Sequence, residues 1–322
     1  MRVLFNVYPI AFDVPGGGEI QLLKTKEALI AANVEIELFN QWKPQFGWAQ
    51  LVHYFSVFGG SSVFCDYVKG KGLPLVISPI LWPKGDITGY PMHEIQHLLS
   101  KADLLFPNST AEAEALSEVF NIPIEKFHVT HNGVDAIFLE KSQPSPELFK
   151  THFNINEQFV LCVGNIEKRK NQIRLAQAAA RLRIKTLLIG NIRDQAYLEE
   201  TLRLGSGFVS YLGSLPHHDP LLRSGYRACS VFALPSLLET PGLAALEAAA
   251  LGSKIVITEV GSTREYFGTR ASYVFPEDVD SIMQGLKTAL GSRDSFLNEQ
   301  IGKFSWQATA QQAIDGYTRL LK

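Results

Sequence analysis

The stretch that decides the fold is FVLCVGNIEKRKNQIRLAQAAARLRIKTLLIGN, residues 159–191. It begins with a short apolar run, passes through a glycine turn into an alanine-rich helical pattern, and ends in a second apolar run. Two parallel strands need a crossover connection between them, and that connection is usually a helix. The stretch therefore predicts one strand–helix–strand unit of a parallel sheet.

The same alternation extends in both directions. The expected strands lie at 2–8, 34–40, 51–56, 74–79, 103–108 and 128–133, and then at 159–165, 186–191, 208–214, 229–236 and 254–260. Helical patterns such as 19–33 and 111–121 separate them. Alternating strands and helices predict parallel sheets with helices on both faces. The expected fold class is α/β, with two Rossmann-like parallel-sheet domains facing a cleft.

The domain organisation follows from length and from a break in the pattern. The chain has 322 residues, and single cores rarely grow beyond roughly 250–300 residues. The polar segment 140–158, which holds Pro144 and Pro146, is typical of a linker. We expect a first domain over residues 1–145, a second over 146–303, and a C-terminal helix, 304–322, that packs back toward the first domain.

Composition and charge exclude several classes of protein. The chain is 46% hydrophobic and 19% charged, as in ordinary globular proteins, and its net charge of −2 does not suit a nucleic-acid binder. Residues 1–150 hold 11 Lys/Arg and 16 Asp/Glu, a net −5, and the remainder holds 19 and 16, a net +3. The second half therefore suits an anionic ligand better. Three widely spaced cysteines and the lack of a long apolar run predict a cytoplasmic protein.

The stretch SLLETPGLAALEAAALG, residues 236–252, holds two glutamates around a helix start. Helix N-termini bind anions, and a phosphate is expected on the free amides there. Carboxylates accept hydrogen bonds from sugar hydroxyls, so one glutamate suits a sugar and the other a ribose on either side of that phosphate. The residues of this predicted site are Glu239, Thr240, Pro241, Gly242, Leu243 and Glu247.

Two other turns suit phosphate groups. Gly17 and Gly18 belong to a glycine run between a strand and a helix, where backbone amides can approach an anion, although a flexible turn explains them equally. Arg169 and Lys170 stand where a helix begins and oppose its dipole, a cost that a docked anion offsets. A solvated charged turn is the alternative interpretation.

Six motifs stand together in one order: GGGE (16–19), PNST (107–110), HNGVD (131–135), VGNIEKRKN (163–171), the two glutamates eight residues apart, and EVGSTREYFG (259–268). In this order and spacing the sequence resembles family 4 of the retaining nucleotide-sugar glycosyltransferases, the glycosyl transferases group 1, which have the GT-B fold.

The resemblance implies an activity and roles. It implies transfer of a sugar, with retention, from a nucleotide-diphosphate donor to a carbohydrate or lipid-linked acceptor, in polysaccharide or glycoconjugate synthesis and without metal or cofactor. It implies that Glu239 contacts the donor sugar as the catalytic residue, that Glu247 contacts the ribose and Lys170 the diphosphate, and that Gly17 and Gly18 close over the phosphates.

The sequence also departs from the family pattern. Asn165 stands where the family has arginine, so Arg169 is expected to substitute, and Ser78 and Pro79 stand where many members have histidine. Glu19 and His53 are the candidates on the acceptor side. A nucleotide-sugar epimerase and a catalytically silent sugar-nucleotide-binding protein remain the alternatives, and acceptor dependence separates all three.

Three further patterns receive plainer interpretations. HEIQH (93–97) matches a zinc-protease pattern, but it lies where the fold needs an ordinary helix, and DVD (278–280) is expected to cap a helix. Aromatic residues in QWKPQFGW (41–48) suit a core, an acceptor cleft or an interfacial anchor. We expect no metal and at most weak peripheral contact with the inner face of the membrane.

Overall fold

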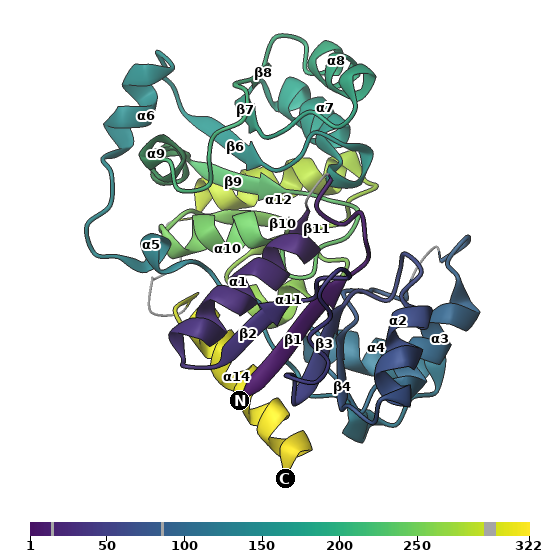
Figure 1. Ribbon diagram of the computed structural model, residues 1–322. Helices are drawn as coiled ribbons and strands as arrows, with labels where there is room; N and C mark the ends of the chain where they lie inside the picture. The colour runs from purple at the N-terminus through teal and green to yellow at the C-terminus, as the bar shows by residue number, and fades with distance from the viewer. Residues whose placement is uncertain (14–15, 85–86, 293–300) are drawn as a thin grey trace. The chain divides into compact units, whose positions relative to one another are not determined.

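A computed structural model describes residues 1–13, 16–84, 87–292 and 301–322 (Figure 1). The chain divides into two compact units, each built around its own sheet. The first unit comprises Met1–Gly133 together with Phe304–Lys322, and the second comprises Val134–Lys303.

The first unit contains a five-stranded parallel sheet in the order β2-β1-β3-β4-β5. Its strands are β1 (Arg2–Val7), β2 (Glu35–Leu38), β3 (Leu51–Phe55), β4 (Leu75–Ser78) and β5 (Leu104–Leu105). Its helices are α1 (Gly17–Ala31), α2 (Ser62–Gly70), α3 (Met92–Lys101), α4 (Thr110–Phe120) and α14 (Trp306–Leu321), with a 3₁₀ turn, η1 (Ile124–Lys126).

Alternate residues of the strands pack into two hydrophobic cores, one on each face of this sheet. Leu4 and Tyr54 pack with the apolar sides of α2, α3 and α4. Val3 and Phe5 face the other way and pack with α1 and α14. Since side chains alternate between faces along a strand, a sheet covered on both faces needs apolar residues at nearly every position, as these strands have.

The C-terminal helix α14 is an integral part of the first unit, beside α1 (Figure 1). Ala313 and Tyr317 of α14 are buried in the core that α1 shares. Gly133 lies against the backbone that leads into this helix, where an added Cβ would come within 2.3 Å of Ser305 and Trp306 atoms. Only a glycine therefore fits at the point where the chain end passes.

The second unit contains a six-stranded parallel sheet in the order β11-β10-β9-β6-β7-β8. Its strands are β6 (Phe159–Val163), β7 (Lys185–Ile189), β8 (Val209–Tyr211), β9 (Val231–Leu234), β10 (Ile255–Thr258) and β11 (Ser272–Val274). Its helices are α5 (Ala136–Leu139), α6 (Pro146–His152), α7 (Gln172–Leu182), α8 (Gln195–Leu204), α9 (Pro220–Ala228), α10 (Leu243–Ala250), α11 (Thr263–Phe267) and α12 (Val279–Gly291), with a 3₁₀ turn, η2 (Lys168–Lys170).

The boundary between the units differs from the predicted one at 145/146. The second unit begins at Val134 and ends at Lys303. Phe138 is buried beside the ring of Tyr226, and the hydroxyl of Ser224 donates to the carbonyl of Ser145 at 2.6 Å. The segment that looked like a linker is therefore held against α9 by packing and hydrogen bonds.

One predicted strand is not formed, and one observed strand was not expected. Residues 128–133, predicted as a strand, form no strand, and an isolated bridge between Leu105 and Phe127 lies just before them. β11 (Ser272–Val274) was not among the expected strands. Within the described ranges, no helix combines the length and the apolar character required to cross a bilayer.

Candidate functional site

Two loops of the second unit meet beyond the carboxyl ends of β6 and β9, which are neighbours in the sheet. The backbone N–H of Leu237 donates to the Arg169 carbonyl at 2.9 Å. The buried Asn171 amide donates to the Pro235 carbonyl at 2.8 Å. These bonds hold the loop after β6 against the loop after β9, at the edge where α/β sheets bind ligands.

An ion pair joins the two loops. The Nζ of Lys170 lies 2.5 Å from Oε1 of Glu239, and their side chains are only 14% and 6% exposed. Nη1 of the half-exposed Arg169 lies 4.0 Å from the same oxygen. Burial would raise the pKa of the Glu239 carboxyl, but the charges of Lys170 and Arg169 outweigh burial and hold the pKa below its usual value. Glu239 is thus a buried carboxylate at neutral pH.

The backbone of Glu239 is held by a third loop, which follows β10. Its N–H donates to the Val260 carbonyl at 3.2 Å, and its carbonyl accepts from the N–H of Ser262 at 3.1 Å. Gly261 has φ +108°, and a Cβ there would lie 2.1 Å from the Glu239 carbonyl oxygen. The glycine of EVGSTREYFG therefore permits the close approach that fixes Glu239.

The helix α10 begins directly after this glutamate. Gly242 is its N-cap residue, with φ +90°, and the preceding Thr240–Pro241 peptide is cis. In the described part of the chain, no protein acceptor takes a hydrogen bond from the N–H of Gly242 or Leu243. These amides are the positive end of the helix dipole, close to the Lys170–Glu239 pair.

Glu247 lies further along α10 and is nearly buried. Its Oε1 lies 2.8 Å from Nε2 of His217, and its Oε2 accepts from the hydroxyl of Tyr226 at 2.9 Å. Nδ1 of His217 lies 3.3 Å from a carboxylate oxygen of Asp135. Burial and the charge of Glu247 raise the pKa of Tyr226 well above its usual value, so this hydroxyl remains a donor.

The sequence did not reveal that His217 and Tyr226 contact Glu247. It also did not reveal that Asp135, which belongs to the motif HNGVD, contacts His217. These side chains come from three separate segments of the chain, and no local spacing connects them. It also missed Arg193, beside Asn165. With its amide oxygen placed toward Arg193, Asn165 accepts from Nε and Nη2 at 3.1 and 3.2 Å.

A second acidic group lies among these cations. Glu167 accepts from Arg169 at 3.3 Å and pairs with Arg193 at 3.0 Å. Arg193, from the loop after β7, thus places a guanidinium beside Asn165 and Glu167. Arg169, at the rim, is 51% exposed and is the more accessible of the two cations that face Glu239.

The glycine loop of the first unit is held by Glu19. Its Oε2 accepts from the N–H of Gly16 at 2.7 Å, and its Oε1 accepts from the Tyr8 hydroxyl at 2.9 Å. A Cβ on Gly17 would meet nothing within 4 Å, and one on Gly18 would meet only Ile80, at 3.4 Å. The carboxylate of Glu19 thus braces the turn, and packing alone does not require glycine at either position.

His53 lies inside the first unit and not at a strand end. It is 1% exposed, with Nδ1 2.6 Å from the Tyr317 hydroxyl and Nε2 2.9 Å from the Ser78 hydroxyl. Burial lowers its pKa to about 3, so the ring is neutral. The prediction that His53 faces an acceptor is corrected: the ring joins β3, β4 and α14.

The metal-like motifs have ordinary partners. On α3, Nε2 of His97 lies 2.8 Å from Asp66. Asp278 caps α12 by accepting from the N–H of Asp280 at 2.8 Å, which confirms the capping interpretation of DVD. Among the described residues, one group of three potential ligands comes together, formed by Asp135, His217 and His218, with ligand atoms within 4.8 Å of one another.

Comparison with known proteins shows which families the chain resembles. Residues 157–292 match the family described as glycosyl transferases group 1. The serotype-specific mannosyltransferase WbdA of Escherichia coli is 29% identical over 243 residues, 69% of this chain and 29% of that protein. A D-inositol 3-phosphate glycosyltransferase of Mycobacteroides abscessus is 28% identical over 238 residues, 70% of this chain and 54% of that protein. The chain spans about half or less of the length of these curated relatives.

Solved structures agree in fold. The sucrose-phosphate synthase of Thermosynechococcus elongatus has a TM-score of 0.79 at 17% identity, over 99% of both chains. Anabaena HepE in complex with UDP has a TM-score of 0.75 at 19% identity, over 99% of this chain and all of that one. The fold class is that of GT-B proteins, with two parallel-sheet α/β domains. The family match, over residues 157–292, lies within the second unit.

Proposed function

We propose that this chain is a retaining glycosyltransferase, which moves a sugar from a nucleotide-diphosphate donor to an acceptor hydroxyl. The observation that carries the proposal is the Lys170–Glu239 pair beside the start of α10. It sets a cation, a carboxylate and helix N-terminal amides at one edge of the sheet. A diphosphate needs the cation and the amides, and a sugar needs the carboxylate.

In this proposal the donor diphosphate binds to the amides of Gly242 and Leu243, with Lys170 and Arg169 turned toward it. The bond between the sugar's anomeric carbon and the phosphate oxygen breaks while a bond to the acceptor oxygen forms. A phosphate oxygen takes the acceptor proton. The fixed positive groups stabilise the charge that develops on the departing diphosphate, so no metal or cofactor is assigned to this step.

The two glutamates hold the hydroxyls on either side. Glu239, kept ionised by Lys170, accepts from hydroxyls of the transferred sugar. Glu247 binds the ribose, and the bonds from Tyr226 and His217 orient its carboxylate. A carboxylate offers about four lone-pair positions. These two donors leave room for a diol.

The biological setting is part of the proposal. Among the relatives, WbdA is a serotype-specific mannosyltransferase, and we propose for this chain a role in cell-surface polysaccharide or glycoconjugate synthesis. The acceptor is then a carbohydrate or a lipid-linked sugar. We place the reaction in the cytoplasm, with weak contact at the inner face of the membrane.

An acceptor-dependence assay tests the proposal. UDP-, GDP- and dTDP-sugars are first screened for thermal stabilisation of the protein, and the stabilising donor is then incubated with and without mixed saccharide acceptors. We expect sugar transfer only with an acceptor, unchanged by EDTA, and abolished in Glu239→Gln. Conversion of the donor without an acceptor would identify an epimerase, and binding without turnover a silent binding protein.

A further inference from the structure

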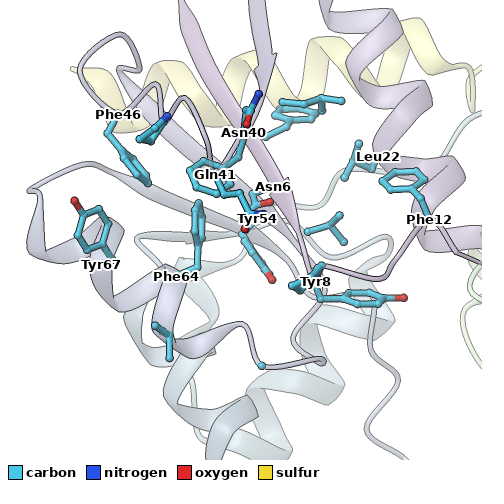
Figure 2. Close-up of a pocket in the computed structure, with 18 residues that line it drawn as sticks. Asn6, Tyr8, Phe12, Leu22, Asn40, Gln41, Phe46, Tyr54, Phe64 and Tyr67 are labelled. Carbon is cyan, nitrogen blue, oxygen red and sulfur yellow. The ribbon is translucent and has the colours of Figure 1, made fainter.

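A large pocket opens in the first unit, beyond the carboxyl ends of β1 and β2 (Figure 2). Its volume is about 980 Å³, at the upper end of the range for small-molecule sites. Asn6 at the end of β1, Leu38 at the end of β2 and Tyr54 on β3 line it from the sheet side. Every described residue that lines it belongs to the first unit.

Aromatic rings form much of its wall. Tyr8 and Phe12 line it from the segment after β1, Phe46 from the segment after β2, and Phe64 and Tyr67 from α2. The rings of Phe46 and Tyr67 lie 5.2 Å apart between centroids, and Tyr67 remains 51% exposed. Partly exposed rings of this kind offer flat apolar surface to a ligand that has an apolar face.

Amide groups supply the polar part of the lining. Figure 2 shows Asn6, Asn40 and Gln41 among these rings. Asn40 uses its side-chain oxygen to accept from the N–H of Trp42 at 2.9 Å, which leaves its two N–H donors. Within the described ranges, no protein group bonds to the side chains of Asn6 or Gln41. An amide both donates and accepts, as a sugar hydroxyl does.

The lining carries no ionic side chain. Among the described residues that form it there is no Asp, Glu, Lys, Arg or His. Burial raises the pKa of Tyr54 to about 12, so this hydroxyl stays neutral. Lys43 belongs to the same loop, between the lining residues Gln41 and Pro44, but does not line the pocket itself. Binding an ionised phosphate here would therefore cost desolvation without an ionic partner.

We propose that this pocket binds an uncharged saccharide, with its C–H faces on the aromatic rings and its hydroxyls on the three amides, and that it discriminates against phosphorylated sugars. The inference rests on the proposed function, since it names the class of acceptor. A hydrocarbon chain fits the rings but leaves three amides without partners, which disfavours it.

Saturation-transfer NMR without any donor tests the binding directly. Methyl glycosides and maltose are compared with glucose 6-phosphate and mannose 6-phosphate. We expect neutral sugars to bind at least tenfold more tightly than their phosphates. Tyr67→Ala and Asn6→Asp should each weaken neutral-sugar binding at least fivefold, and Val63→Lys, at a lining position that is 80% exposed, should raise phosphate affinity. Trp42→Ala is the matched control, because Trp42 is 87% exposed and lies outside the lining.

Three results would overturn the inference. One is equal or tighter binding of sugar phosphates, especially if Lys43→Ala removes it. Another is an equal loss in Tyr67→Ala and Trp42→Ala. The third is affinity of alkyl glycosides that rises with chain length alone, which would mark a hydrocarbon site. Sugar binding without transfer would support the pocket proposal and contradict the proposed function. Transfer by a Tyr67→Ala variant with unchanged acceptor KM would support the proposed function and contradict the pocket proposal.

Discussion

Lys170 carries its charge into a largely enclosed position because Glu239 faces it at 2.5 Å. Removing one partner of a buried pair leaves an uncompensated charge, which typically costs about 3–5 kcal/mol. Replacing either residue alone is therefore destabilising, and a bound diphosphate would have to share the lysine with the carboxylate.

The first prediction concerns Lys170→Ala. We expect this variant to lose far more affinity for nucleoside diphosphates than for monophosphates, because the lysine is assigned to the diphosphate. A charge-assisted hydrogen bond contributes roughly 1.5–3 kcal/mol. Calorimetry with both nucleotides measures the difference, with the exposed Lys168→Ala of the same turn as control. Equal losses for the two nucleotides would make Lys170 a structural residue only.

The second prediction concerns His53 and pH. The folded pKa of about 3 lies below the usual 6.5, so the unfolded state binds the additional proton between these values. Stability from the neutral ring is therefore present above pH 6.5 and is lost as pH falls toward 3, by about 2 kcal/mol at pH 5. The lowered pKa of Glu239 acts in the same direction, but only below its usual 4.5.

Urea unfolding at pH 7 and pH 5 measures this effect. The wild type should lose about 2 kcal/mol more between the two pH values than His53→Gln does. The comparison uses the change with pH, so a general destabilisation of the variant does not affect it. Identical pH dependence in both proteins would mean that the ring takes up a proton while folded.

At the scale of elements, α14 depends on close approach at Gly133. Gly133→Ala places a methyl group against the backbone before α14, which cannot move aside as a side chain can. Overpacking typically costs about 1–3 kcal/mol. We expect that loss in unfolding experiments, together with faster hydrogen exchange in α14. Gly70→Ala in α2, where a Cβ would meet nothing within 4 Å, is the control and should change little.

The elements also show what the sequence could predict. In the second unit, β6 to β10 follow from apolar runs and glycine turns, because those signals are local. The pairing of Leu237 with Arg169 and the contacts of Glu247 with Tyr226 join distant segments, so no spacing reveals them. His53 was misplaced because its exposure depends on α14, which reaches it through Tyr317 from the far end of the chain.

The lining of the pocket in the first unit also could not be predicted from local sequence patterns. QWKPQFGW suggested several roles, and the structure separates its aromatic residues. Trp42 is 87% exposed, whereas Phe46 and Trp48 pack against the core of the first unit, and Phe46 also lines the pocket. The path of the loop after β2 determines which of these aromatic side chains is buried and which is exposed. No periodic pattern in the sequence predicts that path.

At the scale of the whole molecule, charge is unevenly distributed. Residues 1–150 carry a net charge of −5. Anionic lipids attract each Lys or Arg near the surface by about 1 kcal/mol, so the net electrostatic attraction of this region to such a membrane is small. We predict weak, salt-insensitive binding to anionic vesicles in co-sedimentation at low and high salt. Trp42→Ala should reduce what binding remains, since this exposed ring suits an interface. Strong binding that salt abolishes would contradict the prediction.

The central claim is retaining transfer of a sugar from a nucleotide donor, and the anomeric configuration of the product tests it most directly. ¹H NMR is recorded during turnover, with the donor and acceptor that the screen identifies, and the coupling of the anomeric proton is compared between donor and first-formed product. The account predicts the same anomeric configuration in both. A product of opposite configuration, or an isomerised sugar nucleotide with the acceptor unconsumed, would contradict it.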